Sequence, residues 1–212
     1  MKIITRKQQA GVSMVETIIA FPVMLVLGLG IIHLGLVYQA KANLEYAALM
    51  AARVGSVTNI NIPLMTAEVG KRMAPSIIGD SMAIDQSLIT IQVLNPTIAM
   101  FDACGEPASE LGVACVQAQC EIPNFGLQYR PTTNDCGVVN IQDANVLRIK
   151  VTYRFNSMIP FMNVRLFSGD DQNNINDYTP QAGMNIHAVA TVRMQSPARY
   201  TIDNSCCFAP GG

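Results

Sequence analysis

The longest apolar run of the chain begins close to its N-terminus and predicts a membrane-spanning helix. Residues 17–38 number 22 and contain no Asp, Glu, Lys or Arg; His33 is their one basic side chain. At about 1.5 Å per residue, a helix of this length crosses the roughly 30 Å hydrocarbon core of a bilayer. Lys2, Arg6 and Lys7 precede the run, and this bias predicts a cytoplasmic N-terminus with the remainder of the chain on the other side.

Helical periodicity continues beyond the apolar run. Five apolar positions there have the i, i+3, i+4, i+7, i+8 spacing of one helix face: Leu44, Ala47, Ala48, Ala51 and Ala52. Gly55, just after the last of these positions, is a suitable residue to end the helix. We therefore expect one helix over about residues 13–54, roughly 60 Å long, with a kink at Pro22. Residues 12–38 would be the transmembrane segment, and 39–56 the exported continuation of the helix.

The pattern changes after residue 57 and predicts an α+β domain over 57–212. A short helix is expected after Pro63, since proline suits the first helical turn. Apolar and polar residues then alternate in residues 89–93, 147–155 and 186–194, which predicts three half-buried strands. Such alternation is typical of an antiparallel sheet with one solvated face. Its apolar face should pack on the exported half of the long helix.

Composition fits a membrane-anchored exported protein. Charged residues make up only 14% of the chain and the formal net charge is −1. The sequence has no basic patch with interleaved aromatic residues, and tryptophan is absent. Nothing in the sequence therefore indicates nucleic-acid binding.

All six cysteines follow the apolar run: Cys104, Cys115, Cys120, Cys136, Cys206 and Cys207. An even number confined to the exported part predicts disulfides formed in an oxidising compartment. Four of them lie in a loop-rich insert at about 96–145. Six cysteines allow 15 pairings, and the sequence selects none. We expect Cys206 and Cys207 to bond two different partners and so to tie the C-terminal tail to the insert.

Metal-dependent and catalytic alternatives find less support. The first four cysteines are separated by ten, four and fifteen residues with neither histidine nearby, whereas zinc knuckles pair close cysteines with another such pair or with histidines. His187 alternates outward on a predicted strand. Residues 169–177 lack the EF-hand spacing and read as a polar loop. Residues 158–167 would close the core or contact a membrane or neighbouring subunit. We predict no catalytic residue, no metal and no cofactor.

The start of the apolar run carries a lone acid, Glu16, five residues after Gly11. A carboxylate within a membrane segment costs about 2.5–3.5 kcal/mol on insertion scales and calls for a partner. The short basic leader, Gly11, Val12 and Glu16 together resemble the processing site of type IV pilin precursors. The resemblance implies a leader of residues 1–11, cleavage between Gly11 and Val12, and N-methylation of the new terminus. Glu16 would pair with the terminal amine of a neighbouring subunit. An ordinary signal anchor is the alternative.

The resemblance extends beyond the processing site. Pro22 follows Glu16 by six residues, and A-A-L-M-A-A-R-V-G occupies residues 47–55. Residues 151–162 and 187–194 are similar to two C-terminal strand motifs. Together these segments resemble the TadE-like family, minor pilins or pseudopilins of tight-adherence (Flp-type) systems. The cysteine-rich insert has no counterpart in that resemblance.

The resemblance implies a single-pass protein of the bacterial inner membrane whose C-terminal domain is periplasmic or extracellular. Its expected partners are the prepilin peptidase, the major pilin, a sister minor pilin and the inner-membrane assembly platform, and it implies no enzymatic reaction. A subunit of a type II secretion or conjugative pilus is one alternative. A membrane-tethered binding module that recognises a ligand through the disulfide-stabilised insert is another.

Overall fold

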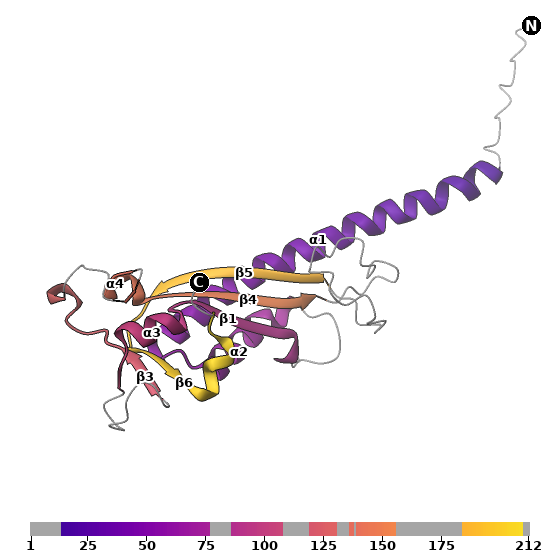
Figure 1. The fold of residues 1–212 in the computed structure, drawn as a ribbon. Helices are drawn as coiled ribbons and strands as arrows, with labels where there is room; N and C mark the ends of the chain where they lie inside the picture. Colours follow the sequence, from indigo (N-terminus) through magenta and orange to yellow (C-terminus); the bar gives the residue numbers. More distant parts are fainter. Residues whose placement is uncertain are drawn as a thin grey trace, which may run out of the picture.

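The computed structural model describes residues 14–76, 86–107, 119–130, 136–137, 139–155 and 184–209. Its main feature is α1 (Met14–Val57), a single helix of 44 residues that extends about 66 Å at the standard rise. The long N-terminal helix is thus confirmed. It remains helical on both sides of Pro22. Figure 1 shows that its first half projects beyond the rest of the molecule, whereas its second half lies along the sheet.

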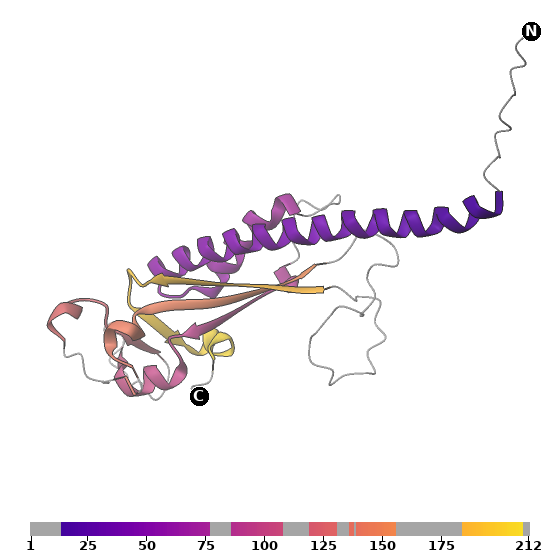
Figure 2. The same cartoon turned by 90° about the horizontal axis from the view of Figure 1, so that it is seen from above.

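The second half of α1 is held by the periodic apolar face that the sequence contains. These side chains are at most 1% exposed: Ala40, Leu44, Ala47, Ala48, Ala51 and Ala52. Alanine has a small side chain, so the helix backbone approaches the strands β4 (Val146–Phe155) and β5 (Met184–Arg193) closely along this face. Figure 2 shows α1 running along one side of these strands.

Three antiparallel strands form the main sheet in the order β1-β4-β5, with β1 (Ile89–Asn95) at one edge. All three predicted strands are present, and β5 begins two residues earlier than expected. Leu147, Ile149 and Val151 on the central strand are fully buried. Because they alternate with polar residues, one face of β4 enters the core and the other faces outward. The predicted α+β class is confirmed.

A tight corner joins α1 to α2 (Ile62–Met73), where the Asn61 side chain caps the first turn. The carbonyl oxygen of Ser56 accepts hydrogen bonds from the backbone N–H groups of Gln195 at 2.9 Å and Ser196 at 2.8 Å. The backbone N–H of Asn59 donates to Ser196 Oγ at 3.0 Å. The turn after β5 therefore supplies partners that the end of α1 would otherwise lack.

The described residues of the insert contain more regular structure than its loop-rich composition predicts. Its strands β2 (Glu106–Pro107) and β3 (Gln119–Ile122) join β6 (Ala198–Thr201) in a second antiparallel sheet of order β2-β3-β6. The short helices of this part are α3 (Ile98–Cys104) and α4 (Ile141–Ala144). The 3-10 segments of the described chain are η1 (Ala74–Ser76), η2 (Gln86–Leu88), η3 (Leu127–Tyr129) and η5 (Ile202–Cys207).

One disulfide links the insert to itself, between Cys104 at the end of α3 and Cys136, 32 residues later. Cys206 and Cys207 are free thiols with their sulfur atoms 2.9 Å apart, so the predicted disulfides between the tail and the insert are not present. Cys120 is buried on β3, and Cys115 lies outside the described residues.

The C-terminal tail is instead held by strand pairing and aromatic packing. Strand β6 pairs with β3, and the rings of Phe101, Tyr200 and Phe208 lie with centroids 5.5–5.6 Å apart. This spacing is favourable for edge-to-face aromatic contacts. The tail therefore reaches the insert as expected, but through apolar contacts and backbone hydrogen bonds.

Candidate assembly surface on the N-terminal helix

The first half of α1 presents a continuous apolar surface to its surroundings. The following side chains along it are all more than half exposed: Ile18, Ile19, Phe21, Met24, Val26, Leu27, Ile31 and Ile32. Within the described residues, one helix is long and apolar enough to cross a membrane, over Glu16–Val57. An exposed apolar surface of this extent is typical of a segment that contacts lipid or other proteins.

Glu16 lies in the first turn of α1 and is exposed. A carboxylate at this end of a helix interacts favourably with the helix dipole. The ion pairs of the described part of the chain do not include Glu16. Gly11 and Val12, the predicted processing residues, lie outside that part.

Among the described residues, an aromatic contact joins the end of the sheet to α1 at His33. The rings of His33 and Phe155, the last residue of β4, lie with centroids 6.4 Å apart. Leu36 and Val37 pack against the core, and Ala40 is the first fully buried position. The edge of the domain therefore lies inside the predicted 12–38 segment. The part of α1 before His33 has 19 residues and spans about 28 Å, close to the thickness of a bilayer core.

Charged side chains appear on α1 just beyond this point. Lys41 Nζ lies 3.4 Å from a carboxylate oxygen of Glu45 and also donates to the backbone oxygen of His187 on the edge strand β5. Lys41 is the first charged residue after Glu16, so the change from apolar to charged surface coincides with the start of the domain.

Further along, Arg72 of α2 binds Glu68 at 2.8 Å and lies 5.7 Å from the centroid of the Tyr46 ring. The hydrogen bond to Glu68, together with the charge of Glu68, raises the pKa of Arg72. Burial raises the pKa of Tyr153 on β4. These interactions are those of a charged, solvated exterior and a buried strand face, respectively.

The structure also locates the other residues that the sequence singled out. His187 is exposed on β5, as the alternation predicts. Burial, followed by the hydrogen bond and charge of Cys206, raises the pKa of Cys207 to about 11. In the part of the chain that the structure describes, no three His, Cys, Asp or Glu side chains come together to hold a metal ion. Residues 158–167 and 169–177 lie outside it.

The contact between His33 and Phe155 was not predicted from the sequence. The apolar run alone continues to Tyr38, and hydropathy does not reveal where a domain begins to cover a helix. The one available signal was the aromatic residue that ends the alternation of β4, which places an apolar ring at the membrane-proximal end of the sheet.

The fold and α1 together define a protein with one candidate membrane span and an α+β domain. Residues 11–53 match the family described as TadE-like protein, which confirms the family resemblance over this segment. The match begins at Gly11 and covers nearly all of α1. No curated protein and no solved structure matches the chain. The family match and the apolar helix fit a membrane protein associated with a Tad pilus.

Proposed function

We propose that this chain is a minor pilin or pseudopilin that α1 anchors in the inner membrane and that supports assembly of a tight-adherence (Flp-type) pilus. The observation that carries the proposal is the division of α1 into two halves. The apolar half projects free of the domain, and the other half is the spine on which the sheet packs (Figure 1). This division suits a subunit that exchanges lipid contacts for contacts with neighbouring helices.

Small residues on an exposed face of α1 support close helix packing. A Cβ atom added at Gly28 or at Gly35 would meet no heavy atom within 4 Å. The two glycines are seven residues apart, so they share one helix face. In membranes, helices associate through such faces because small residues let the backbones approach. We infer that this face contacts a helix of the major pilin or of a sister minor pilin.

Glu16 would be the recognition residue of that assembly. After cleavage at Gly11, the new amino terminus of Val12 would lie four residues before Glu16. A subunit placed beside this one could bring its terminal amine to the carboxylate, and the pair would offset the cost of an unpaired charge in an apolar environment. The chain itself supplies no reaction chemistry in this role.

The remaining partners follow from the same proposal. A prepilin peptidase removes residues 1–11, and an inner-membrane assembly platform receives the processed subunit. The basic leader keeps the N-terminus in the cytoplasm, so the α+β domain is periplasmic or, in a pilus, extracellular.

The decisive test is the intact mass and N-terminal peptide of the protein extracted from membranes with and without an active prepilin peptidase. We expect a chain that starts at Val12, lacks eleven residues and carries one additional methyl group. A chain that retains residues 1–11 in the presence of the active peptidase would overturn the proposal.

A substitution of Glu16 tests the assembly step separately. We expect Glu16→Ala to reduce incorporation into pili or pilus-assembly complexes at least tenfold, because removal of one partner of a buried ion pair costs about 3–5 kcal/mol. The thermal midpoint of the domain should not change, since Glu16 lies far from it. Glu45→Ala, which removes an exposed acid from the same helix, is the matched control and should assemble normally.

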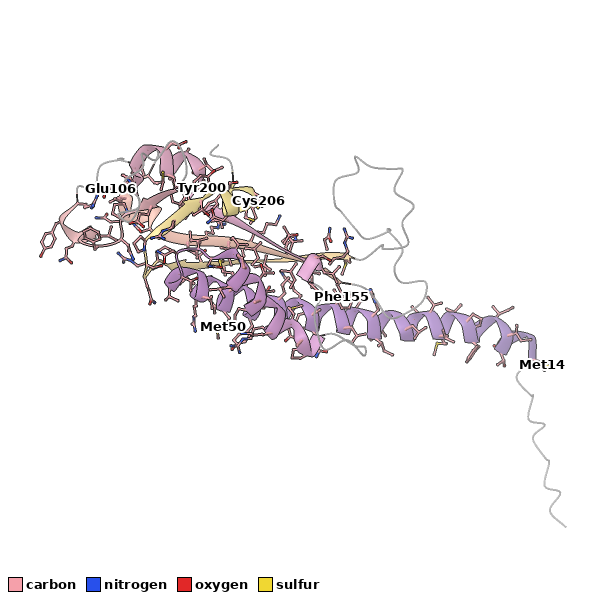
Figure 3. The ribbon with its side chains drawn as sticks, turned by 90° about the horizontal axis from the view of Figure 1, so that it is seen from below. Met14, Met50, Glu106, Phe155, Tyr200 and Cys206 are labelled. Carbon is pink, nitrogen blue, oxygen red and sulfur yellow. A yellow bond between two sulfur atoms is a disulfide. The ribbon has the colours of Figure 1, made fainter. Side chains whose placement is uncertain are left out.

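A membrane-tethered binding module remains the second candidate, and one observation favours it. The insert exposes two aromatic side chains, Phe125 at 76% and Tyr129 at 85%. Tyr129 precedes Arg130, which forms an ion pair with Glu106 at 3.2 Å, and Figure 3 shows Glu106 at the opposite end of the molecule from Met14. Retention of the leader in the mass measurement would make this candidate the leading one.

A further inference from the structure

The outward face of the main sheet carries an array of cations. Arg148, Lys150 and Arg154 occupy alternate outward positions of β4, and Arg193 is outward on β5. The three arginines are exposed and Lys150 is half-buried. Helix α1 packs on the other face of these strands (Figure 2). We call these four residues the cationic face.

Within the described residues, the strands that form the cationic face contribute no compensating acid. Strands β1, β4 and β5 have no Asp or Glu. The cross-strand neighbours of the four cations are all uncharged: Thr191, Val189, Gln92, Asn95, Asn185 and Val146. An opposite charge across strands would stabilise the sheet. The four cations therefore lack a stabilising cross-strand ion pair.

The remaining cations of the described residues behave differently. Apart from Arg53, every described lysine or arginine outside the cationic face takes part in an ion pair: Lys41, Lys71, Arg72, Arg130 and Arg199. The chain as a whole has a formal net charge of −1. Among the described residues, unpaired positive charge is therefore concentrated on one face of the sheet, and that face is complementary to a polyanion.

The spacing of the charges indicates a linear partner. Alternate residues of a strand are about 7 Å apart, so the cations from Arg148 to Arg154 span roughly 20 Å along β4. Arg193 lies diagonally across from Arg148, within about 8 Å. Hydroxyl and amide side chains stand beside the cations, at Thr152 on β4 and Gln92 on β1. Such a row can bind successive acidic groups and the hydroxyl groups between them.

We propose that the cationic face binds an anionic polysaccharide, a polymer whose sugar units carry carboxylate or phosphate groups. Single-stranded nucleic acids require aromatic side chains on which bases stack, and the outward positions of β1, β4 and β5 contain no Phe, Tyr or Trp. This binding goes beyond the proposed role in assembly and does not depend on it. Through this face the domain would contact an acidic polymer outside the inner membrane.

The test uses the full chain in an uncharged detergent and measures its affinity for polygalacturonate at several NaCl concentrations. We expect the triple variant Arg148→Gln, Lys150→Gln, Arg154→Gln to bind about ten- to hundredfold more weakly and with a smaller salt dependence, because each exposed ion pair contributes modestly. The matched control is Arg53→Gln, Lys71→Gln, Arg72→Gln, which removes the same formal charge from α1 and α2. It should bind like the unaltered chain.

Two further measurements keep the proposal open to refutation. Arg148→Lys with Arg154→Lys preserves the charge and should retain binding, which separates charge from folding. Neutral dextran should not bind. Absence of binding to polygalacturonate by the unaltered chain, an equal loss in both triple variants, or tighter binding to a single-stranded oligonucleotide would each overturn the proposal. None of these outcomes bears on the N-terminal processing at Gly11.

Discussion

Asn145 is a polar residue at the centre of the molecule and is fully buried. Its side-chain Nδ2 donates to the backbone oxygens of Pro123 and Ile141, both at 2.9 Å. Its own backbone oxygen accepts from the N–H of Met194 at 3.0 Å. One residue therefore joins the insert, α4 and the segment after β5.

Replacement of Asn145 by alanine should destabilise the domain. The substitution removes the side-chain donor to the Pro123 oxygen and one of two donors to the Ile141 oxygen, which also accepts from the backbone N–H of residue 145. The loss of these buried hydrogen bonds costs about 1–3 kcal/mol of unfolding free energy. Urea unfolding followed by circular dichroism measures the loss. Asn145→Asp keeps the shape of the side chain but removes the donated hydrogen bonds, and should be at least as destabilising. If Asn145→Asp retains full stability, these hydrogen bonds do not hold the insert to the sheet.

The raised pKa of Cys207 predicts that the folded domain becomes less stable at alkaline pH. Burial, with the neighbouring Cys206, raises the pKa of its thiol from 9.0 to about 11, so the folded state disfavours the thiolate. The contribution of the protonated Cys207 thiol to the unfolding free energy is therefore fully present below about pH 9 and is lost as the pH rises towards 11. Under reducing conditions, the unfolding free energy of the unaltered chain should fall over this window relative to that of Cys207→Ser. A constant difference between the two would contradict the assigned pKa.

At the scale of elements, the insert depends on its disulfide because its strands are short. Strand β2 has two residues and β3 has four, too few to be stable alone. The bond between Cys104 and Cys136 closes a loop over a sequence separation of 32. A cross-link of this length lowers the entropy of the unfolded chain and so stabilises the folded state by roughly 3–4 kcal/mol.

The double variant Cys104→Ser, Cys136→Ser should therefore lower the urea midpoint of the domain by an amount equivalent to about 3–4 kcal/mol. Reducing agent should produce a similar loss in the unaltered chain and little further change in the double variant. An unaltered urea midpoint in the double variant would show that apolar packing alone orders the insert.

The elements themselves differ in how far the sequence predicts them. Helix α1 and strands β1, β4 and β5 were predicted because each repeats its apolar period long enough to be recognised, and α2 was predicted from Pro63 in its first turn. Strands β2, β3 and β6 were not. The alternation of β3 covers only Cys120 and Ile122 as buried positions, and its partner β6 lies about 80 residues away in the sequence. Pairing over such a separation depends on the tertiary fold and is not indicated by the local sequence.

At the scale of the whole molecule, the contact of His33 with Phe155 sets how deeply α1 can enter a membrane. The sheet cannot enter the hydrocarbon core with its polar edge, because unpaired backbone groups are costly there. The membrane boundary should therefore lie between Ile32 and Tyr38, and the domain should rest directly on the membrane surface.

Cysteine labelling measures this boundary. In sealed vesicles that display the domain outward, Tyr38→Cys should react with a membrane-impermeant maleimide and Leu27→Cys should not, with peptide masses identifying each modified site. Both side chains are more than half exposed in the isolated chain, so packing does not account for a difference. Leu27→Cys should become reactive in detergent. Protection of Tyr38→Cys in vesicles would move the boundary into the domain.

The amino-acid sequence by itself determined the anchor, the two-part helix, the class of the domain and the family resemblance at residues 11–53. These properties depend on local chemistry: apolar length, an alanine stripe, strand alternation, and a lone acid after a glycine. Only the tertiary structure decided the pairing of Cys104 with Cys136, the burial of Asn145, the contact of His33 with Phe155 and the gathering of cations on one sheet face. Each of these requires residues distant in the sequence to meet, and strand register, which local pattern does not specify, brings them together.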